Sequence, residues 1–315
     1  MKKERGTNFK GIIISLVVVI TMLLLIIYFD KIISFTGNVV NVDFNISIGA
    51  GNAPQIIRIL NHSIADLTVN EAGNTNVSIN FTVIDTDGVS NLNTLANVSM
   101  IRAGEDLRKN VTCFRYQSSG NNANYTCQVD LWWFDAAGSW RINATLSDVS
   151  GNVAENSTQN LTINTLTGFR LGPGNVSFST LNPAATNQTA SNVIVLNNTG
   201  NQDIANGSNQ VNSTTLYGEN NNALALHSGN FTMSNNTGAG NPQCDLSGAS
   251  ASRMALVSGS AFTFVNGANM SRGNYTKQDG RGQEQLYLCL TLVGSELSQQ
   301  SYSTAEAGAW IVKIS

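Results

Sequence analysis

An uninterrupted apolar segment near the amino terminus constrains this chain more than any other feature. It begins at Ile12 and ends at Phe29, and its 18 residues include only Ser15 and Thr21 as polar side chains. A helix rising about 1.5 Å per residue spans roughly 27 Å over that length, close to the ~30 Å hydrocarbon core of a bilayer. We therefore predict a transmembrane helix over residues 12–29, with membrane lipid as its partner.

The residues before this segment set its expected orientation. Residues 1–11 carry four basic side chains and one acidic side chain, a net charge of +3. Basic residues stay on the cytoplasmic side of a membrane. The expected arrangement is a cytoplasmic tail over residues 1–11 in a single-pass protein of the cell membrane, with the domains after residue 31 outside the cell.

Two alternatives to an uncleaved anchor stay open. A cleaved secretory signal has an apolar region of about 7–15 residues before its cleavage site, which is shorter than the segment here. A prepilin leader is cut after a dipeptide that resembles Lys10-Gly11, directly before the apolar run, or Arg5-Gly6, a little earlier; the mature chain then begins at Ile12 or Thr7. In archaeal pilins the apolar helix then packs in the core of a filament, so the mature amino terminus distinguishes an anchor from a filament subunit.

The composition excludes one large class of partner. Charged residues make up 12% of the chain, about half of the usual share. The 17 Lys and Arg residues are outnumbered by 20 Asp and Glu residues, for a net charge of −3. Nucleic-acid binding requires clustered basic residues, so we expect no nucleic-acid partner. Polarity comes instead from 42 Asn, 31 Ser and 27 Thr residues.

Acceptor motifs for N-glycosylation are unusually frequent. The chain contains 19 Asn-x-Ser/Thr sequences, all of them beyond the apolar segment, whereas chance placement of these residue types gives about 8 such motifs. In 12 of the 19 the middle residue is apolar. On a strand the acceptor Asn then lies on the face opposite that apolar residue and points to solvent.

We predict glycosylation at twelve of these positions: Asn45, Asn61, Asn76, Asn80, Asn97, Asn110, Asn124, Asn143, Asn160, Asn175, Asn230 and Asn274. The remaining motifs lie at Asn156, Asn187, Asn197, Asn206, Asn212, Asn235 and Asn269. The alternative explanation is that Asn-rich sequences favour turns. That alternative accounts for motifs such as Asn197 and Asn206, but not for two motifs within one alternating run, at Asn76 and Asn80.

Residues 30–53 are expected to form a stem. Its apolar residues alternate with polar ones from Val40 to Ile48, which predicts a half-buried amphipathic strand. This strand either contacts the domain that follows or completes the sheet of another subunit.

The following segment, residues 54–165, carries the pattern of an all-β domain. Val77 to Val83 alternate, as do Tyr125 to Trp133 and Trp140 to Leu146, and Val111 shares a phase with Cys113. About seven strands in about 110 residues, with turn signals between them, predict an immunoglobulin-like sandwich.

Several short motifs in this segment carry a resemblance to a known class of protein. Asp85-Thr-Asp-Gly-Val89, Trp132-Trp-Phe-Asp135 and Ser147-Asp-Val-Ser-Gly-Asn-Val153 resemble the Ig-like repeats of bacterial and archaeal cell-surface proteins. Further along, Asn197-Asn-Thr-Gly-Asn201 and Tyr287-Leu-Cys-Leu290 resemble sandwich modules of archaeal surface and S-layer-associated proteins. The resemblance implies an archaeal-type cell-surface glycoprotein and leaves its ligand undefined.

A glycine-rich segment, residues 166–174, is expected to link the first domain to a second. Residues 175–315 contain apolar strands at Val193–Leu196, Leu286–Leu292 and Trp310–Ile314, and predict a second β-sandwich. The expected fold is therefore an all-β ectodomain of two tandem Ig-like or β-sandwich domains, preceded by one transmembrane helix.

The four cysteines lie beyond the apolar segment, in what we expect to be an oxidising compartment. Four cysteines allow three pairings, and the division into two domains favours Cys113–Cys127 and Cys244–Cys289. A zinc site is the alternative, but no Cys-x-x-Cys motif is present.

No motif of a catalytic or cofactor site is present. His62 and His227 have no partners nearby in sequence, and nucleophile-elbow, zinc-protease and phosphate-loop motifs are missing. We therefore predict that the protein is not an enzyme and needs no cofactor. Asp85, Asp87 and Asp148 are calcium candidates because Ca²⁺ takes clustered oxygen ligands, with turn capping as the favoured alternative.

Three consecutive aromatic residues, Trp132, Trp133 and Phe134, form the other candidate site. Consecutive strand residues point to opposite faces, so at least one ring is expected to face outward, either as a carbohydrate-stacking platform or beneath a glycan or a domain contact. Together these features predict a membrane-anchored, N-glycosylated cell-surface protein with a structural or adhesin-like role. A pilin-like or strand-exchanging filament subunit, joined through residues 39–48, is the alternative. Other envelope proteins or glycans are the expected partners.

Overall fold

The computed structural model describes residues 9–36, 51–61, 66–247, 251–254 and 261–315, with side chains of the first helix described from residue 13 to residue 28. The chain divides into two compact units, Met1–Ala50 and Gly51–Ser315. The predicted strand within residues 40–48, the acceptor Asn45 and His62 lie outside the described residues, as does the side chain of Asn61.

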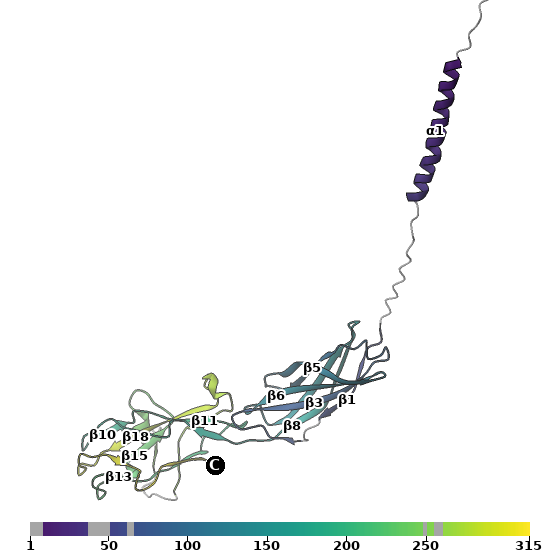
Figure 1. The fold of residues 1–315 in the computed structure, drawn as a ribbon. Coiled ribbons are helices and arrows are strands. Elements are labelled where there is room, and N and C mark those ends of the chain that lie inside the picture. The colour runs from purple at the N-terminus through teal and green to yellow at the C-terminus, as the bar shows by residue number, and fades with distance from the viewer. Residues whose placement is uncertain (1–8, 37–50, 62–65, 248–250, 255–260) are drawn as a thin grey trace, which may run out of the picture. The chain divides into compact units, whose positions relative to one another are not determined.

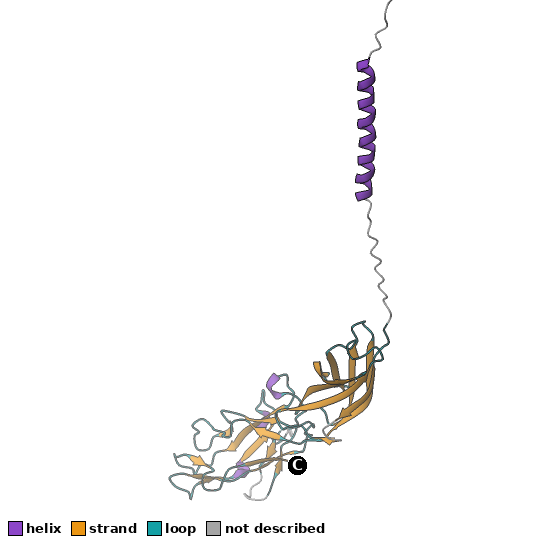
Figure 2. Ribbon diagram, turned by 45° about the vertical axis from the view of Figure 1, so that its right-hand side comes forward, coloured by secondary structure: helices purple, strands orange, loops and turns teal. Residues whose placement is uncertain are grey.

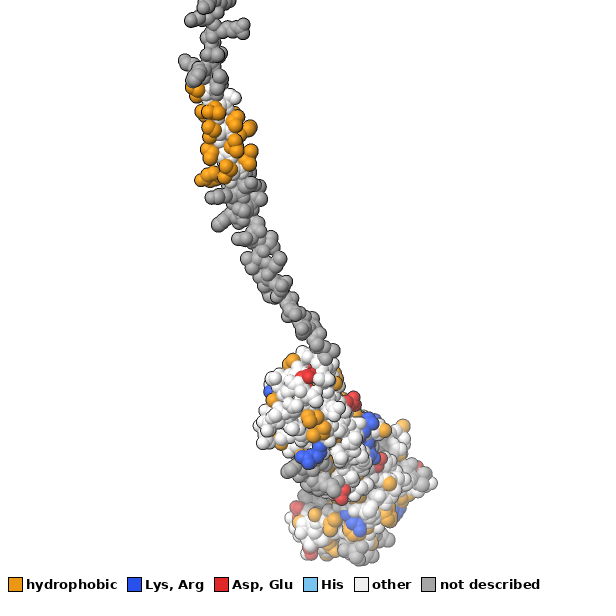
Figure 3. Space-filling model, turned by 90° about the vertical axis from the view of Figure 1, so that its right-hand side faces the viewer, with side chains coloured by type: hydrophobic (Ala, Val, Ile, Leu, Met, Phe, Trp, Pro, Cys, Tyr) orange, Lys and Arg blue, Asp and Glu red, His pale blue; other side chains and the backbone are white. Residues whose placement is uncertain are grey.

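The first unit contains one long helix, α1 (Phe9–Thr36) (Figure 1). All fourteen large apolar side chains from Ile13 to Tyr28 are exposed, and they cover the described part of the helix in the space-filling view (Figure 3). Within the described residues, no helix reaches the combined length and hydropathy that mark a membrane span. The predicted transmembrane helix at residues 12–29 is therefore not confirmed.

The second unit begins with an eight-stranded sheet. Its strands are β1 (Gln55–Asn61), β2 (Asp66–Leu67), β3 (Asn74–Ile84), β4 (Leu95–Ile101), β5 (Arg108–Ser119), β6 (Asn122–Trp132), β7 (Gly138–Ser147) and β8 (Val153–Ile163). They are ordered β1-β3-β6-β5-β4-β7-β8-β2. All neighbours are antiparallel except β2 and β8. The sheet folds over into two facing layers (Figure 2), and the Asn156 amide of β8 donates to the Ile56 carbonyl of β1 at 2.8 Å.

The core between these layers follows the predicted alternation. On β3, β6 and β7 every second residue is buried, and Phe81 stacks on Tyr125 with ring centroids 5.3 Å apart. Trp140 is fully buried and donates its indole N–H to the carbonyl of Ala136 at 2.8 Å. Each such side chain contributes about 1.5–3 kcal/mol by leaving water. The prediction of a β-rich, sandwich-like fold is confirmed.

One predicted core position is wrong, and a bulge explains why. Val111 was expected to share the inward phase of Cys113, but its side chain is 53% exposed. Cys113 pairs with Ala96 and Asn110 pairs with Val98, so two residues of β5 stand opposite one residue of β4. The extra residue of this β-bulge turns Val111 outward.

Both predicted disulfides are present, one in each half of the unit. Cys113 and Cys127 join β5 to β6 inside the first core, with Cα atoms 4.3 Å apart. Cys244 and Cys289 join a 3₁₀ helix to a strand in the second half, with Cα atoms 5.3 Å apart.

The remainder of the unit contains many shorter strands around a second core. Its main sheet contains β9 (Phe169–Leu171), β10 (Thr186–Thr189), β11 (Ile194–Asn198), β15 (Phe231–Ser234), β16 (Ser252–Arg253) and β18 (Gln283–Leu292). Two three-stranded sheets are formed by β12 (Asn209–Asn212), β17 (Thr263–Phe264) and β20 (Ile311–Ile314), and by β13 (Leu216–Gly218), β14 (Ala225–Leu226) and β19 (Tyr302–Ser303). The 3₁₀ helices are η1 (Ser228–Asn230), η2 (Pro242–Cys244) and η3 (Tyr275–Lys277).

Two features of this half differ from the sequence-based expectation. Residues 169–171, within the segment predicted as a linker, form β9 and pair with β11. The seven residues from Asn209 to Thr215 are all buried although only one of them is apolar. Several of their side chains find backbone partners: the Asn209 amide N–H donates to the Ala268 carbonyl and the Thr214 hydroxyl donates to the Gly308 carbonyl, whereas the Asn209 oxygen and the Ser213 hydroxyl have no partner among the described residues. Buried polar groups are kept when they are hydrogen-bonded in this way.

Candidate functional site

The predicted glycan acceptors lie at accessible positions wherever their side chains are described. Asn76, Asn97, Asn160 and Asn175 are exposed. The half-buried acceptors are Asn80, Asn110, Asn124, Asn143, Asn230 and Asn274. Glycan occupancy itself stays a prediction.

Strand alternation produces this exposure in the first sandwich. On β3 the buried residues Val77 and Phe81 follow Asn76 and Asn80, so both acceptors lie on the outer face of the sheet. The amide of Asn76 donates to the Asp130 carboxylate at 2.9 Å. On β7 the same alternation leaves the acceptor Asn143 half-buried between the buried residues Ile142 and Ala144.

Three acceptor motifs close into a tight local turn. The side-chain oxygen of Asn274 accepts from the backbone N–H of Thr276 at 3.1 Å and from its hydroxyl at 2.6 Å. Asn110 and Thr112 form the same pair of bonds, as do Asn156 and Thr158. This is an Asx-turn, the conformation that such side chains favour.

One motif counted from the sequence is inaccessible in the fold. Asn212 lies in β12, is 3% exposed, and donates its amide to the Ala261 carbonyl at 3.0 Å. The number of Asn-x-Ser/Thr motifs therefore exceeds the number of asparagines that a glycosyltransferase can reach on the folded chain.

The three calcium candidates meet at one end of the first sandwich, where they cap turns. Asp148 accepts from the backbone N–H and the side-chain amide of Asn152, at 2.8 and 2.9 Å. Asp85 accepts from the backbone N–H of Asp87 at 2.9 Å, and the amide of Asn91 lies between Asp85 and Asp148. No cluster of three or more metal-ligating side chains occurs in the described part of the chain. Asp85 and Asp148 therefore cap turns in the structure, and calcium binding stays the alternative.

The same cluster holds the start of the domain. Asp87 accepts from the backbone N–H of Asn52 at 2.6 Å and from its side-chain amide at 2.8 Å, while the Asn152 amide donates to the Gly51 carbonyl at 2.9 Å.

Desolvation is the largest single effect on the pKa of Asp148 and raises it. The hydrogen bonds from Asn152, Ser150 and Asn91 together outweigh it and hold the pKa of Asp148 below its usual value.

The aromatic triplet divides between a buried ring and an accessible pair. Trp133 is 4% exposed and packs against Phe134 and Tyr275, with ring centroids 4.9 and 5.6 Å away. Trp132 is 36% exposed and stacks on Phe134 at 6.2 Å. One ring therefore makes a contact with the second half of the unit, and another stays open to solvent.

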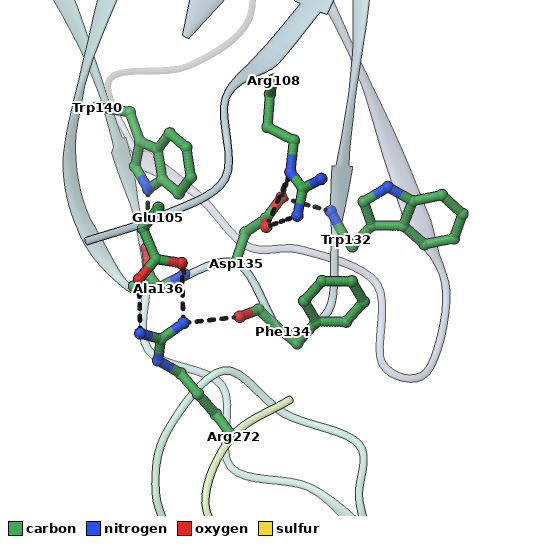
Figure 4. A network of polar contacts seen from close by, with 8 residues as sticks. All are labelled: Glu105, Arg108, Trp132, Phe134, Asp135, Ala136, Trp140 and Arg272. Carbon is green, nitrogen blue, oxygen red and sulfur yellow. Dashed lines mark hydrogen bonds and ion pairs between the residues drawn. The ribbon is translucent and has the colours of Figure 1, made fainter. Parts of the chain in front are cut away.

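Two ion pairs lie beside this triplet, and the sequence patterns gave no signal for either (Figure 4). Arg108 pairs with the buried Asp135, which also accepts from the backbone N–H of Trp132 at 2.8 Å. Arg272 pairs with Glu105 and donates to the Phe134 carbonyl at 3.0 Å. Glu105 and Arg272 are 167 residues apart in sequence, so no local pattern links them.

The comparisons with known proteins leave the family open. No protein-family model matches the chain, and no curated protein matches it. Among the solved structures that match is a secreted serine protease, VesC from Vibrio cholerae, at 10% identity and a TM-score of 0.20. The match covers 76% of this chain and 49% of the protease, so this chain spans about half the length of that protein.

This comparison corrects one prediction. The sequence motifs predicted a protein that is not an enzyme, whereas one of the solved structures matched is a protease. The exclusion of enzymes is accordingly withdrawn. At a TM-score of 0.20 the likeness assigns no activity to this chain.

Proposed function

We propose that this chain is a membrane-anchored, N-glycosylated cell-surface protein with a structural or adhesin-like role. The observation that carries the proposal is the placement of the acceptor asparagines. Each of the ten predicted acceptors whose side chain is described keeps access to solvent, while the residues beside them on β3, β6 and β7 are buried. The two disulfides support an oxidising, extracytoplasmic location.

The strand order supports an Ig-like first domain, and the sequence motifs at residues 85–89, 132–135 and 147–153 are the ground for the archaeal or bacterial surface type. β3 pairs with β6, β4 with β7 and β7 with β8, which is the neighbour pattern of the B–E, C–F and F–G strands in an immunoglobulin sandwich. Surface proteins use such modules as spacers and binding scaffolds, and glycans on the outer faces discourage association between exposed sheet edges.

The anchor is supported by the sequence of residues 12–29. A helix that is apolar on every side requires an apolar environment. Membrane lipid supplies this environment for an anchor, with residues 1–11 in the cytoplasm. The packed helices of a filament core supply it for a pilin-like subunit, which we keep as the second candidate because Lys10-Gly11 precedes the run.

Glycopeptide mass spectrometry on the protein from its native cells tests the glycosylation. We expect glycans at the exposed acceptors Asn76, Asn97, Asn160 and Asn175, and none at the buried Asn212. The buried motif is a matched internal control because it shares the consensus sequence. Glycan at Asn212, or bare asparagine at all four exposed positions, contradicts the proposal.

Carbonate extraction of membranes and the mass of the mature amino terminus test the anchor. An intact amino-terminal tail in a carbonate-resistant membrane fraction supports the anchor. A chain that begins at Ile12 or Thr7 supports the filament subunit instead. Recovery of the full chain in the carbonate-soluble fraction contradicts both.

A further inference from the structure

A polar groove of about 580 Å³ lies on the second half of the unit. One wall is the outer face of β18, from which Gln283, Gln285 and Tyr287 project on alternate residues, because Leu286 and Leu288 face the core. The loop that carries η3 also lines the groove, and it lies beside β11, since the backbone N–H of Asn198 donates to the Gly282 carbonyl. This loop contributes Tyr275, Gln278 and Arg281 to the groove.

The loop is held in place at its base. The backbone N–H of Gly282 donates to the Ser271 carbonyl at 3.1 Å, and the N–H of Asn198 donates to the Gly282 carbonyl at 2.8 Å. A Cβ atom at Gly273 would lie 2.5 Å from the Cβ of Arg281, so the close approach of the two loop ends requires glycine. The ring of Trp133 also packs against the ring of Tyr275, with centroids 5.6 Å apart. The groove is therefore preformed, which lowers the entropic cost of binding.

The side chains in the groove match a sugar better than an apolar ligand. Two tyrosine rings, Tyr275 and Tyr287, offer flat apolar surfaces edged by hydroxyl groups. The amides of Gln283, Gln285 and Gln278 also line the groove. Gln283 already donates to Asn197 and Gln285 already accepts from the Tyr287 hydroxyl, which leaves the Gln283 oxygen, the Gln285 NH₂ group and the Gln278 amide for a ligand. A pyranose ring has the complementary character, with an apolar C–H face and a rim of hydroxyl groups.

The groove lining carries one positive side chain, Arg281, and one negative side chain, Glu284, and within the described residues only Arg281 is free to bind a ligand. The oxygens of Glu284 already accept from protein donors: the N–H of Gln285 at 3.0 Å, the N–H of Asn269 at 3.1 Å and the Asn235 amide at 3.4 Å. The guanidinium of Arg281 makes no ion pair within the described residues. Asp279 accepts from the backbone N–H of Arg281. An unpaired guanidinium is well suited to bind a carboxylate through two parallel hydrogen bonds.

We propose that this groove binds a carboxylate-bearing saccharide, such as a hexuronic acid unit, with its ring on Tyr287 and its carboxylate on Arg281. The inference rests on the adhesin-like role proposed above and names the ligand class of that role. The saccharide has two sources: a separate glycan, or the glycan of this chain at Asn274, which directly precedes the loop residue Tyr275.

Calorimetric titration of the full chain in detergent, produced in a bacterial host without N-glycosylation, tests the binding. The probes are tetragalacturonate and the uncharged galactose tetramer. We expect saturable binding of the acidic tetramer at least tenfold tighter than that of the neutral one. Absence of saturable binding by either probe, or equal binding of both, overturns the proposal. Because this protein carries no glycan, the result is independent of the anchor and glycosylation tests above.

Variants assign the binding to the groove. Tyr287→Ala is expected to weaken tetragalacturonate binding about tenfold, and Arg281→Gln to remove the preference for the acidic probe, with Arg281→Lys retaining part of it. Tyr116→Ala removes an exposed tyrosine from the first sandwich and is the matched control. Circular dichroism spectra must be unchanged in each variant. Unaltered binding by both Tyr287→Ala and Arg281→Gln overturns the assignment.

Comparison with the glycosylated protein identifies the source of the sugar. If the glycan at Asn274 occupies the groove, added tetragalacturonate binds the glycosylated protein more weakly than the bare chain, and Asn274→Gln restores its affinity. Equal affinity in the glycosylated and bare proteins identifies a separate glycan as the ligand. Both results retain the groove as a saccharide site.

Discussion

Replacing Arg108 with methionine tests whether a buried carboxylate in the first sandwich depends on a single guanidinium. The side chain of Asp135 is 1% exposed and that of Arg108 is 16% exposed. The Nε atom of Arg108 donates to both oxygens of Asp135 at 3.0 Å, and Nη2 donates to Oδ1 at 2.5 Å. With methionine in place of Arg108, the carboxylate keeps only the N–H of Trp132 as a described donor.

The expected cost follows from the asymmetry of buried ion pairs. Removing one partner of a buried pair costs about 3–5 kcal/mol because it leaves an uncompensated charge. Since Arg108 retains partial access to water, we expect the lower end, about 3 kcal/mol, for Arg108→Met. The double variant Arg108→Met/Asp135→Asn removes the stranded charge while its amide oxygen still accepts from Trp132. It should therefore be more stable than Arg108→Met alone.

Urea unfolding followed by tryptophan fluorescence measures the effect, because three of the four tryptophans, Trp132, Trp133 and Trp140, lie in or beside the first sandwich. Arg141→Met, at an exposed position of β7, is the matched control and should change stability by less than about 0.5 kcal/mol. A cost below about 1 kcal/mol for Arg108→Met, or a double variant no more stable than that single variant, refutes the reasoning.

Three further predictions concern other parts of the unit. Replacing Cys244 and Cys289 with serine opens a cross-link between residues 45 positions apart and should cost about 4 kcal/mol in chain entropy; an unchanged urea midpoint contradicts this. Because the folded-state pKa of Asp148 is lowered from 3.8, its carboxylate stabilises the fold above that pH and loses this effect as the pH falls through the lower folded-state value. Asp148→Asn should therefore lessen the pH dependence of stability below pH 3.8 in acid unfolding followed by circular dichroism, and an identical profile contradicts the assignment. A double-mutant cycle on Glu105→Ala and Arg272→Ala should give a coupling energy of about 1–2 kcal/mol in thermal unfolding, whereas additive effects would show that the pair is not coupled.

The first sandwich is predicted well from the sequence because its long strands bury one face. On β3 the run from Val77 to Val83 alternates between buried and half-buried positions, and a period of two has no helical counterpart. The disulfide between Cys113 and Cys127 follows from the same reasoning, since both residues face inward across a hairpin. The one local failure, Val111, arises from a bulge that shifts the phase by one residue without changing the composition.

The second half is less predictable for a physical reason. Apart from β18, its strands are short, and several pack polar residues whose amides and hydroxyls bond to distant backbone carbonyls, as Asn209 does with Ala268. Burial of such residues depends on partners that no local pattern reveals. The burial of Asn212 and the pairing of Arg272 with Glu105 are consequences of the same kind of long-range contact.

The saccharide groove is also invisible at the level of motifs. It is lined by Asn235, by loop residues from Tyr275 to Arg281 and by residues of β18, and none of these segments contains a recognisable signature. The sequence places Tyr287 on an outer strand face, but only the fold brings Arg281 and Tyr275 into the same groove. The sequence predicts an exposed ring within Trp132–Phe134, but it gives no sign that the ring of Trp133 packs against the ring of Tyr275.

The contacts at Gly51 and Asn52 have a mechanical consequence. Tension applied to the chain ahead of the first sandwich reaches the domain at these residues, where two bonds to Asp87 and one from Asn152 fasten the backbone to the turns between later strands. Those turns therefore carry part of the load before it reaches the hydrogen bonds between β1 and β3. They protect β1 from separating from β3 one residue pair after another.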